Sequence, residues 1–491
     1  MGIVAGLDSS SEYTRLVVCD TDRGEVLRQG YAAHPEQRDD PQSWLLSLGE
    51  AAEGGLLSEV QAIGVAAQPG LVPLDGAGLP VRNALLGHDR AMQTAAAELV
   101  DLLGGRQAWT EAVGTVPRPT HPVTKLRWLA RTEPEAAGRV AEVLQPHDWL
   151  SWQLLGRPDQ RATDRGDASG SGYWSAVTGE YRPDLVEVAL GHPASLPRVL
   201  GPAEPAGRTP EGLLISAGTG ETMAAAFGLG VGVGDAVVSL GASGSVFSVH
   251  HEPLVDPTGT ISSYADATGR HLPVVRTLNA MRVLRGAAEM LGTDLEGLSR
   301  LALESTPGAY GLVLLPYLEG ERTPELPHTA GSLHGLRRES MRPEHLARAA
   351  VEGMLCGLAD ALDLLRGRGV AIRRVFLLGP QLPVLHKLAP ALWGVPVVVP
   401  EPSDYTALGA ARQAAWALAG SQEPPHWPEP TYQLHEPQEE LAVGQAVRQQ
   451  FVTVREQEHP GAFEGHPLPS AGQPSAEPAG EPTGWAGDQS R

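Results

Sequence analysis

Short apolar segments alternate with polar turns at the start of the chain. Residues 3–7 and 14–19 are apolar and flank the polar stretch 8–12, which predicts two strands joined by a turn. A third strand is expected to begin near Val26, followed by a helix over about 41–53. The apolar stretch 62–66 then predicts a strand that ends at Gln68-Pro69-Gly70. This order of strands and helices is typical of α/β proteins.

The second half of the chain repeats this design. Strands are predicted at 236–240 and 245–249 around the small-residue turn 241–244, and further strands at 374–378 and 397–399. Helices are predicted over 343–366, where apolar residues recur every four positions, and over 406–418. Two halves that open in the same way favour a duplicated α/β architecture, with a nucleotide and a second substrate bound in the cleft between its two lobes. Because hairpins also occur in other large α/β proteins, the pattern alone leaves an unduplicated fold open.

Composition divides the chain into three parts. The glycine-rich stretch 230–234 marks a lobe boundary, so we expect a first lobe over 1–232 and a second over 233–457. The second lobe is predicted to end in an amphipathic helix near 439–457. From residue 458 to 491, Pro, Gly, Ser, Ala and Glu predominate, which predicts a disordered tail.

The charge of the chain limits its partners. The 491 residues carry a formal charge of −21, which argues against nucleic acid and anionic membranes, although backbone N–H groups can still bind a phosphate-bearing small molecule. The N-terminus has no basic region of the kind that opens a secretory signal and reaches an aspartate at Asp8, and no apolar run is long enough to span a bilayer. The only cysteines, Cys19 and Cys356, form no disulfide framework. We therefore expect a cytoplasmic protein that binds small molecules, with a homodimer among the open assembly states.

Six segments resemble the FGGY carbohydrate kinases, and most closely the xylulokinases. They occur in the family's order and span nearly everything before residue 458: TKLRWL (124–129), PHDWL (146–150), TDRGDASG (163–170), LLPYLEGERTP (314–324), ARAAVEG (347–353) and ALGAAR (407–412). The resemblance implies two ribonuclease-H-like lobes of the actin type, with a central cleft that closes over ATP, Mg²⁺ and a sugar.

The first hairpin turn resembles the family motif Asp-x-Gly-Thr-Ser. The resemblance implies that Asp8 serves the Mg²⁺ ion and that Ser10 and Ser11 contact phosphate. Ser10 stands where the family has glycine, so it adds a Cβ and loses glycine's freedom at positive φ. A plain turn at the end of a strand also favours Asp and Ser, which leaves a structural explanation open.

Residues 217–223 resemble the glycine-rich loop that carries the family's general base. The family has an aspartate where this chain has Glu221, and its neighbour, an asparagine sugar contact in xylulokinases, is Thr222. Glutamate has suitable chemistry, but its extra methylene moves the carboxylate by on the order of 1 Å, which can cost roughly 100-fold in rate. A carboxylate at the start of a helix is also favourable without any catalytic role.

The predicted sugar-binding loops are altered. The family pattern Gly-Gln-x-His-Gly reads Ala-Ala-Gln-Pro-Gly over 66–70, so Pro69 replaces an imidazole and removes a backbone donor, while Gln68 is kept as a predicted sugar contact. In the second loop, Trp-Asn-Asp-x-Arg in the family, only Asp89 stands in register. The neighbouring His88 alone is no signal of a metal or a base.

The predicted nucleotide-binding segments are also changed. The second phosphate hairpin, Gly-Thr-Ser-Gly in the family, keeps Gly241 and Ser243 but has Ala242, and a lost donor of this kind can be worth about 2.7–4 kcal/mol. In the adenosine loop Gly379 is kept, but the next glycine is Pro380, which fixes φ and deletes an N–H, and the loop is short. The second adenosine segment, with Ala407 and Gly409, matches the family.

Three functions remain open at this point. The first is an ATP- and Mg²⁺-dependent ketopentose kinase that phosphorylates the 5-hydroxyl of D-xylulose or a related sugar. The second is a pseudokinase with a sugar-binding, regulatory or partner-binding role, suggested by substitutions at five motif positions: Ser10, Pro69, Glu221, Ala242 and Pro380. The third is an actin-like or chaperone-like ATPase, against which the segment 314–324 argues. The histidines form no ligand-spaced cluster, which disfavours a metalloenzyme.

Overall fold

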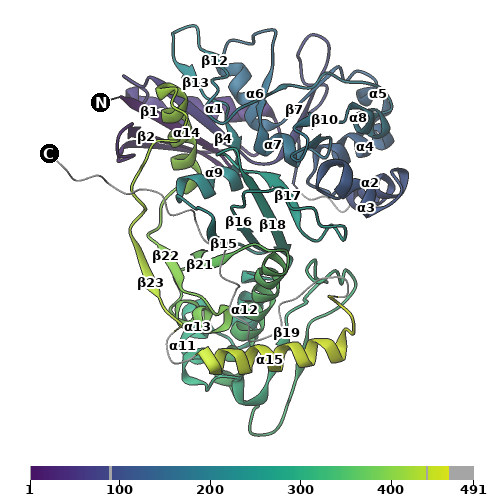
Figure 1. Ribbon diagram of the computed structural model, residues 1–491, viewed down its shortest axis with the longest axis vertical. Helices are drawn as coiled ribbons and strands as arrows, with labels where there is room; N and C mark the ends of the chain where they lie inside the picture. Colours follow the sequence, from purple (N-terminus) through teal and green to yellow (C-terminus); the bar gives the residue numbers. More distant parts are fainter. Residues whose placement is uncertain (1, 88–90, 438–440, 464–491) are drawn as a thin grey trace, which may run out of the picture.

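The chain forms two seven-stranded sheets, one in each half. The computed structural model describes residues 2–87, 91–437 and 441–463 (Figure 1). The first sheet has the order β12-β13-β4-β1-β2-β3, with β14 paired to β4. Its strands are β1 (Ile3–Ser9), β2 (Tyr13–Asp20), β3 (Val26–Ala33), β4 (Ala62–Ala67), β12 (Gly207–Arg208), β13 (Leu214–Ile215) and β14 (Thr219–Gly220). The predicted opening hairpin is confirmed, and β1 runs antiparallel to β2 and parallel to β4.

Helices α1 (Pro41–Ala51) and α6 (Pro146–Leu154) cover the first sheet. Their tryptophans Trp44 and Trp149 are fully buried and meet edge to face, with ring centres 5.9 Å apart. Figure 1 shows a helical region beside this sheet. It is built from α2 (Ala91–Leu102), α3 (Arg106–Val113), α4 (Pro122–Thr132), α5 (Pro134–Ala137) and α8 (Pro183–Leu190), around the small sheet of β5 (Gly70–Leu74), β6 (Leu85–Leu86) and β7 (Glu142–Leu144).

The second sheet repeats the arrangement of the first. Its order is β17-β18-β16-β15-β21-β22-β23. The strands are β15 (Gly234–Leu240), β16 (Gly244–Ser248), β17 (Ser262–Ala265), β18 (His271–Thr277), β21 (Ile372–Leu378), β22 (Val397–Pro400) and β23 (Tyr432–His435). The hairpin β15–β16 corresponds to β1–β2, and β21 runs parallel to β15 as β4 does to β1. The duplicated α/β architecture expected from the pattern is therefore present.

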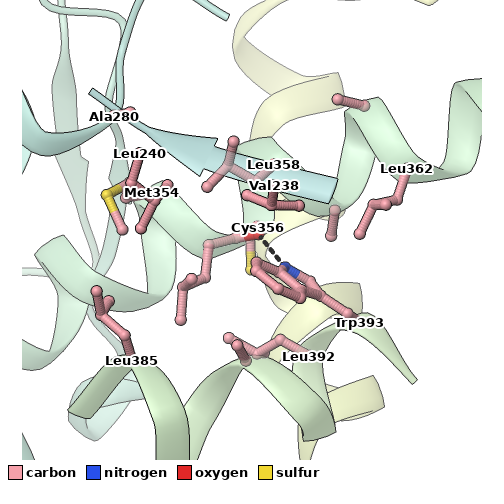
Figure 2. Close-up of a cluster of buried hydrophobic side chains, with 14 of the residues drawn as sticks. Val238, Leu240, Ala280, Met354, Cys356, Leu358, Leu362, Leu385, Leu392 and Trp393 are labelled. Carbon is pink, nitrogen blue, oxygen red and sulfur yellow. Dashed lines mark hydrogen bonds between the residues drawn. The ribbon is translucent and has the colours of Figure 1, made fainter. Parts of the chain in front are cut away.

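The long helix α12 (Pro343–Gly367) forms the core of the second half. The predicted apolar stripe faces the sheet, so that Met354, Leu358 and Leu362 are fully buried (Figure 2). Beneath it packs α13 (Pro383–Trp393), whose Trp393 Nε1 donates to the carbonyl oxygen of Leu355 at 3.1 Å (Figure 2). The layer is completed by α10 (Met281–Met290), α11 (Leu295–Glu304) and α15 (Leu441–Glu458).

Helix α14 (Tyr405–Ala419) lies between β22 and β23 of the second sheet in the chain but packs on the first sheet. A Cβ on Gly6 of β1 would lie 1.9 Å from the carbonyl oxygen of Ala407. On its other side α14 contacts α9 (Glu221–Gly228), where a Cβ on Gly409 would lie 1.9 Å from the carbonyl oxygen of Ala224. These glycines are required because the backbones touch directly. The contacts hold α9 in place at the junction of the two halves (Figure 1).

The packed part of the chain extends beyond residue 458, where composition predicted that a disordered tail begins. Helix α15 ends at Glu458, one residue beyond the predicted 457. Arg455 of this helix is buried against Asp360 of α12, and its guanidinium lies over the ring of Phe463, which is also buried. The tail predicted from residue 458 is therefore packed at least to Phe463, and residues 464–491 lie outside the described residues. Within the described ranges, no helix has the length and apolar character needed to cross a membrane.

Candidate active site

Asp8 lies near the end of β1 as a buried carboxylate without a hydrogen-bond partner at Oδ1. Burial raises the pKa of Asp8 well above its ordinary value, and the negative charges of Glu221 and Asp404 raise it further. Arg15, directly opposite Asp8 on β2, offsets this in part and also reaches Asp404 at 3.3 Å. The structure thus gathers three carboxylates at the junction of the halves, an arrangement that a bound cation would stabilise.

The turn after Asp8 is closed by its own serine. Ser10 Oγ lies 3.1 Å from the carbonyl oxygen of Tyr13, and it accepts hydrogen bonds from the N–H groups of Glu12 and Tyr13. Ser10 does not adopt positive φ, so the strain expected from replacing glycine is absent. Ser11 is exposed at the tip of the turn. Of the two serines, Ser11 is therefore the one whose hydroxyl is free to approach a phosphate.

Gln68 braces the same turn from the neighbouring strand end. Its side-chain Nε2 donates to the carbonyl oxygen of Ser10 at 3.1 Å, and the side chain is buried. This contact is with the protein backbone, so a sugar contact by Gln68 stays a prediction. Pro69 is exposed, and the other predicted sugar contact, Asp89, lies outside the described residues.

Glu221 is the first residue of α9, directly after the loop predicted to carry the base. The loop bends at Gly218, whose φ is +77°, and ends at Gly220, which begins the helix without a side-chain cap. Glu221 is half-buried, and its burial raises its pKa to about 7, with Asp167 adding to the rise and Arg276 opposing it. A carboxylate with a pKa near the working pH suits a general base. Thr222 is half-buried beside it.

A buried histidine–aspartate network lies under this loop. His147 Nδ1 is 2.5 Å from Asp167, and its Nε2 is 3.1 Å from Asp148. Burial alone would lower the pKa of His147, but the carboxylates of Asp148, Asp167 and Asp164 raise it to about 10. Asp164 accepts from the Thr219 hydroxyl of the base loop at 3.0 Å. Potential metal-ligating atoms of His147, Asp164 and Asp167 lie within 4.8 Å of one another, and a protonated His147 offsets part of the negative charge of these carboxylates.

The second predicted phosphate turn joins β15 to β16 and is open to solvent. Gly241, Ala242 and Ser243 are all exposed. The carbonyl oxygens of Gly241 and Ala242 accept from the N–H groups of Met281 and Ala280 at the start of α10, at 3.0 and 3.2 Å. These bonds fix the turn, and Ser243 is the side-chain donor that remains at its tip.

The predicted adenosine loop lies beside this turn. Gly379, at the end of β21, has φ +149°, and a Cβ there would lie 2.8 Å from Cβ of Leu240. Pro380 follows, and α13 begins only three residues later at Pro383. The loop is short, as the sequence indicated. The other predicted adenosine residues, Ala407 and Gly409, are buried in the contacts of α14 with β1 and α9, so the structure assigns them a packing role and their contact with a nucleotide stays a prediction.

Comparison with known proteins identifies the family. The model of the N-terminal domain of the FGGY family of carbohydrate kinases matches residues 3–235, and the model of the C-terminal domain matches residues 236–418. This chain belongs to the FGGY family of carbohydrate kinases. A xylulose kinase from Streptomyces coelicolor is 40% identical over 437 residues, which cover 85% of this chain and 88% of the relative. The crystal structure of a xylulose kinase from Bifidobacterium adolescentis has a TM-score of 0.86 and 36% identity over 92% of this chain and 99% of that chain.

Membership confirms the two-lobed, actin-like fold and supports a sugar kinase. Sugar kinases of this family use ATP, usually with Mg²⁺. The residues fit such an ion, because Asp8 offers a buried, unpartnered oxygen in a group of carboxylates that repel one another. Hard oxygen ligands of this kind are those that Mg²⁺ prefers.

The structure also reveals site residues that the sequence analysis missed. Asp404 caps α14 by accepting from the N–H of Ala407 at 2.9 Å, and its charge acts on both Asp8 and Glu221. His147 and Asp167 lie within segments that carry the family resemblance, which was the available signal. Their role under the base loop depends on contacts between distant parts of the chain.

Proposed function

We propose that this FGGY kinase transfers the terminal phosphoryl group of ATP to a hydroxyl of a ketopentose, converting D-xylulose to D-xylulose 5-phosphate or acting on a related sugar. The observation that carries the proposal is Glu221, a half-buried carboxylate at the start of α9 whose pKa is about 7. The sugar class is supported by the xylulose kinases to which the chain is similar.

Glu221 would accept the proton of the acceptor hydroxyl. As the hydroxyl oxygen forms its bond to the γ-phosphorus, the bond from that phosphorus to the bridging oxygen breaks and ADP leaves. With a pKa of about 7, a large share of Glu221 is unprotonated at neutral pH and ready to accept the proton. Asp8 would hold Mg²⁺, which neutralises phosphate charge when bound. Ser11 and Ser243, at the tips of the two turns, would donate to phosphate oxygens.

A catalytically impaired pseudokinase is the second candidate. Two observations favour it: the exposed second turn presents Ala242 without a hydroxyl, and Pro380 occupies the short loop after β21. Such a protein would bind a sugar or a partner protein without turnover. Whether active kinase or pseudokinase, the protein is proposed to act in the cytoplasm, in line with the free and buried thiols of Cys19 and Cys356. Its proposed assembly is a homodimer, which light scattering would test.

The test is ADP release by purified protein with MgATP and a panel of ketoses and polyols that includes D-xylulose. The proposal expects sugar-dependent release that Glu221→Ala abolishes and Glu221→Asp retains or increases. The matched control is Glu296→Ala, which removes an exposed glutamate from the first turn of α11 and should leave the rate unchanged. Equal rates for wild type, Glu221→Ala and Glu221→Asp would remove Glu221 as the base. Folded protein without any sugar-dependent release would favour the pseudokinase.

A further inference from the structure

Glu321 is a buried carboxylate whose two oxygens are both occupied by protein donors. It lies in the loop after β19 (Val313–Leu315). One oxygen, Oε1, accepts from the N–H groups of Leu278 and Arg322. The other, Oε2, accepts from the backbone N–H and the side-chain amide of Asn279, at 3.3 and 2.9 Å. Because hydrogen bonds to an ionised carboxylate are strong, Glu321 fixes the backbone around it, and neither oxygen is left to accept a substrate proton.

The residues that Glu321 holds stand directly before helix α10. This helix begins at Met281, and Ala280 before it makes no side-chain hydrogen bond to the helix end. The first N–H groups of a helix have no partner within the helix, so they need acceptors elsewhere. The turn between β15 and β16 supplies them. The carbonyl oxygen of Gly241 accepts from the N–H of Met281 at 3.0 Å. The carbonyl oxygen of Ala242 accepts from the N–H of Ala280 at 3.2 Å.

The same two bonds set the direction of the N–H groups of the turn. In a trans peptide unit the C=O and the N–H point in opposite directions. Because the carbonyl groups of Gly241 and Ala242 face α10, the N–H groups of Ala242 and Ser243 point away from it. Within the described ranges, neither of these N–H groups donates to a protein acceptor. Successive free N–H groups of this kind can bind a phosphate oxygen.

The position of the turn depends on the start of α10. Among the residues that the structure describes, 280–282 supply every hydrogen bond that reaches positions 241–243 from outside the β15–β16 hairpin. The turn is otherwise exposed. The loop of Glu321 is tied to the segment before α10 at one further point, where the side-chain amide of Asn279 donates to the carbonyl oxygen of Gly320 at 2.8 Å. A continuous series of bonds therefore runs from Glu321 to the turn.

We propose that Glu321 is a positioning residue of the nucleotide site: it fixes the start of α10, which in turn aims the N–H groups of Ala242 and Ser243 at the phosphate chain of ATP. The inference rests on the proposed kinase function and adds a residue to it. It also gives Ala242 a role, since a backbone N–H at this position can bind phosphate without a hydroxyl. If Glu321 supported only its own loop, its loss would change neither the turn nor nucleotide binding.

The test variant is Glu321→Gln, which keeps the shape of the side chain but turns an NH₂ group toward partners that are all donors. The matched control is Asp266→Asn. Asp266 is another buried carboxylate of the second half, and it accepts from the N–H groups of Thr268 and Arg270 between β17 and β18. The control therefore changes the same kind of contact in a different loop.

The first experiment measures amide hydrogen exchange in the ligand-free protein. In Glu321→Gln the N–H groups of Ala280 and Met281, which donate to the turn and not to Glu321, should exchange roughly 10-fold faster or more. Asp266→Asn should leave their exchange as in wild type. Faster exchange confined to Leu278 and Asn279 would mean that Glu321 supports only its own neighbours, and would overturn the proposal.

The second experiment separates the nucleotide from the sugar. Calorimetry gives the Kd of the β,γ-imido analogue of ATP with Mg²⁺, and initial rates give KM for MgATP and for the sugar. Glu321→Gln should raise the Kd of the analogue and the KM of MgATP roughly 10- to 100-fold and leave the KM of the sugar nearly unchanged. Asp266→Asn should change none of the three.

Unchanged nucleotide binding by Glu321→Gln, or an equal rise in both KM values, would overturn the proposal, as would a wild type that binds no analogue. Weaker binding of the analogue by Glu321→Gln, in a protein that turns over no sugar, would leave the role of Glu321 standing and refute the kinase proposal alone.

A second variant, Asn279→Ala, serves if Glu321→Gln does not fold. It removes one donor to Glu321 and leaves the carboxylate in place. The Kd of the analogue should then rise in the same direction but less, roughly 2- to 10-fold. In that case an unchanged Kd would overturn the proposal.

Discussion

His147 Nδ1 lies 2.5 Å from Asp167 Oδ2, under the loop from which Glu221 starts α9. A Cβ on Gly218 would lie 2.4 Å from His147 Cδ2, and a Cβ on Gly220 would lie 2.4 Å from Asp167 Oδ1. The network therefore supports the loop by direct contact and places a negative charge near the carboxylate of Glu221. Asp167 is a positioning residue that acts on the reaction through Glu221.

Asp167→Asn should shift the pH dependence of the kinase reaction. Next to burial, the charge of Asp167 is the main cause of the raised pKa of Glu221, which is about 7. Because Glu221 must be unprotonated to act as a base, kcat/KM should rise with pH through about 7 in wild type. Removing the charge should move this rise to lower pH by roughly one pH unit. The measurement is a kcat/KM profile across the acidic and neutral range.

The control for this shift is Asp148→Asn. This change removes a carboxylate from the same network, next to His147, but Asp148 is not among the groups that shift the pKa of Glu221. Its profile should keep the wild-type midpoint even if the rate falls. Equal shifts in both variants would mean that the network acts on Glu221 through its structure and not through charge.

Glu221→Gln should stabilise the protein at high pH. The pKa of Glu221 is raised from 4.5 to about 7 on folding, so between these values the folded state binds more protons and stability falls as the pH rises. Above pH 7 Glu221 is ionised in the folded state, and the burial of its charge lowers the free energy of unfolding by the full amount. Glutamine carries no charge, so the variant does not lose this stability. The variant should then be more stable by roughly 1–3 kcal/mol, with the gain shrinking toward pH 4.5.

Thermal unfolding of the ligand-free protein at pH 4.5 and pH 8 tests this stability difference, with the exposed Glu296→Gln as control. A gain for Glu221→Gln that is the same at both pH values would contradict the titration argument. Loss of activity together with a gain in stability at high pH is the pattern expected of a group that is kept for function.

Local pattern predicted most of the fold. Both hairpins and the helix over 343–366 were predicted because strand alternation and helical periodicity are properties of neighbouring residues. The return of α14 to the first sheet could not be predicted in the same way. It depends on glycines such as Gly6 and Gly409, whose partners Ala407 and Ala224 are far away in the sequence.

The candidate site could be predicted only in part from the sequence, for the same reason. The family motifs led to Asp8 and Glu221, and the charge of Glu221 contributes to the raised pKa of Asp8. Asp404 was missed because nothing near it in the sequence indicates that it lies beside Asp8. The effect of Ser10 was misjudged, because its backbone never enters the region that favours glycine.

Pro380→Gly should strengthen nucleotide binding. Pro380 follows Gly379 in the predicted adenosine loop, where it fixes φ and removes an N–H that could face the nucleotide. We expect weak ATP binding by wild type in calorimetry, even with sugar present, and a lower Kd for the variant. Gln381→Gly is the matched control, since it loosens the same loop at an exposed position without restoring the missing donor. A low micromolar Kd for wild type would show that Pro380 is no obstacle.

Gly6→Ala should strongly destabilise the junction of the two halves. The added Cβ would lie 1.9 Å from the carbonyl oxygen of Ala407, and neither β1 nor α14 can give way easily, because both are buried. Overpacking of this kind typically costs about 1–3 kcal/mol, and backbone contact should place the cost at the upper end.

Gly357→Ala is the matched control, since a Cβ there meets nothing within 4 Å in the interior of α12. It should stabilise by up to about 1 kcal/mol through helix propensity. Thermal unfolding decides between these opposite signs, and a neutral Gly6→Ala would mean that α14 is not held against β1 as the structure has it.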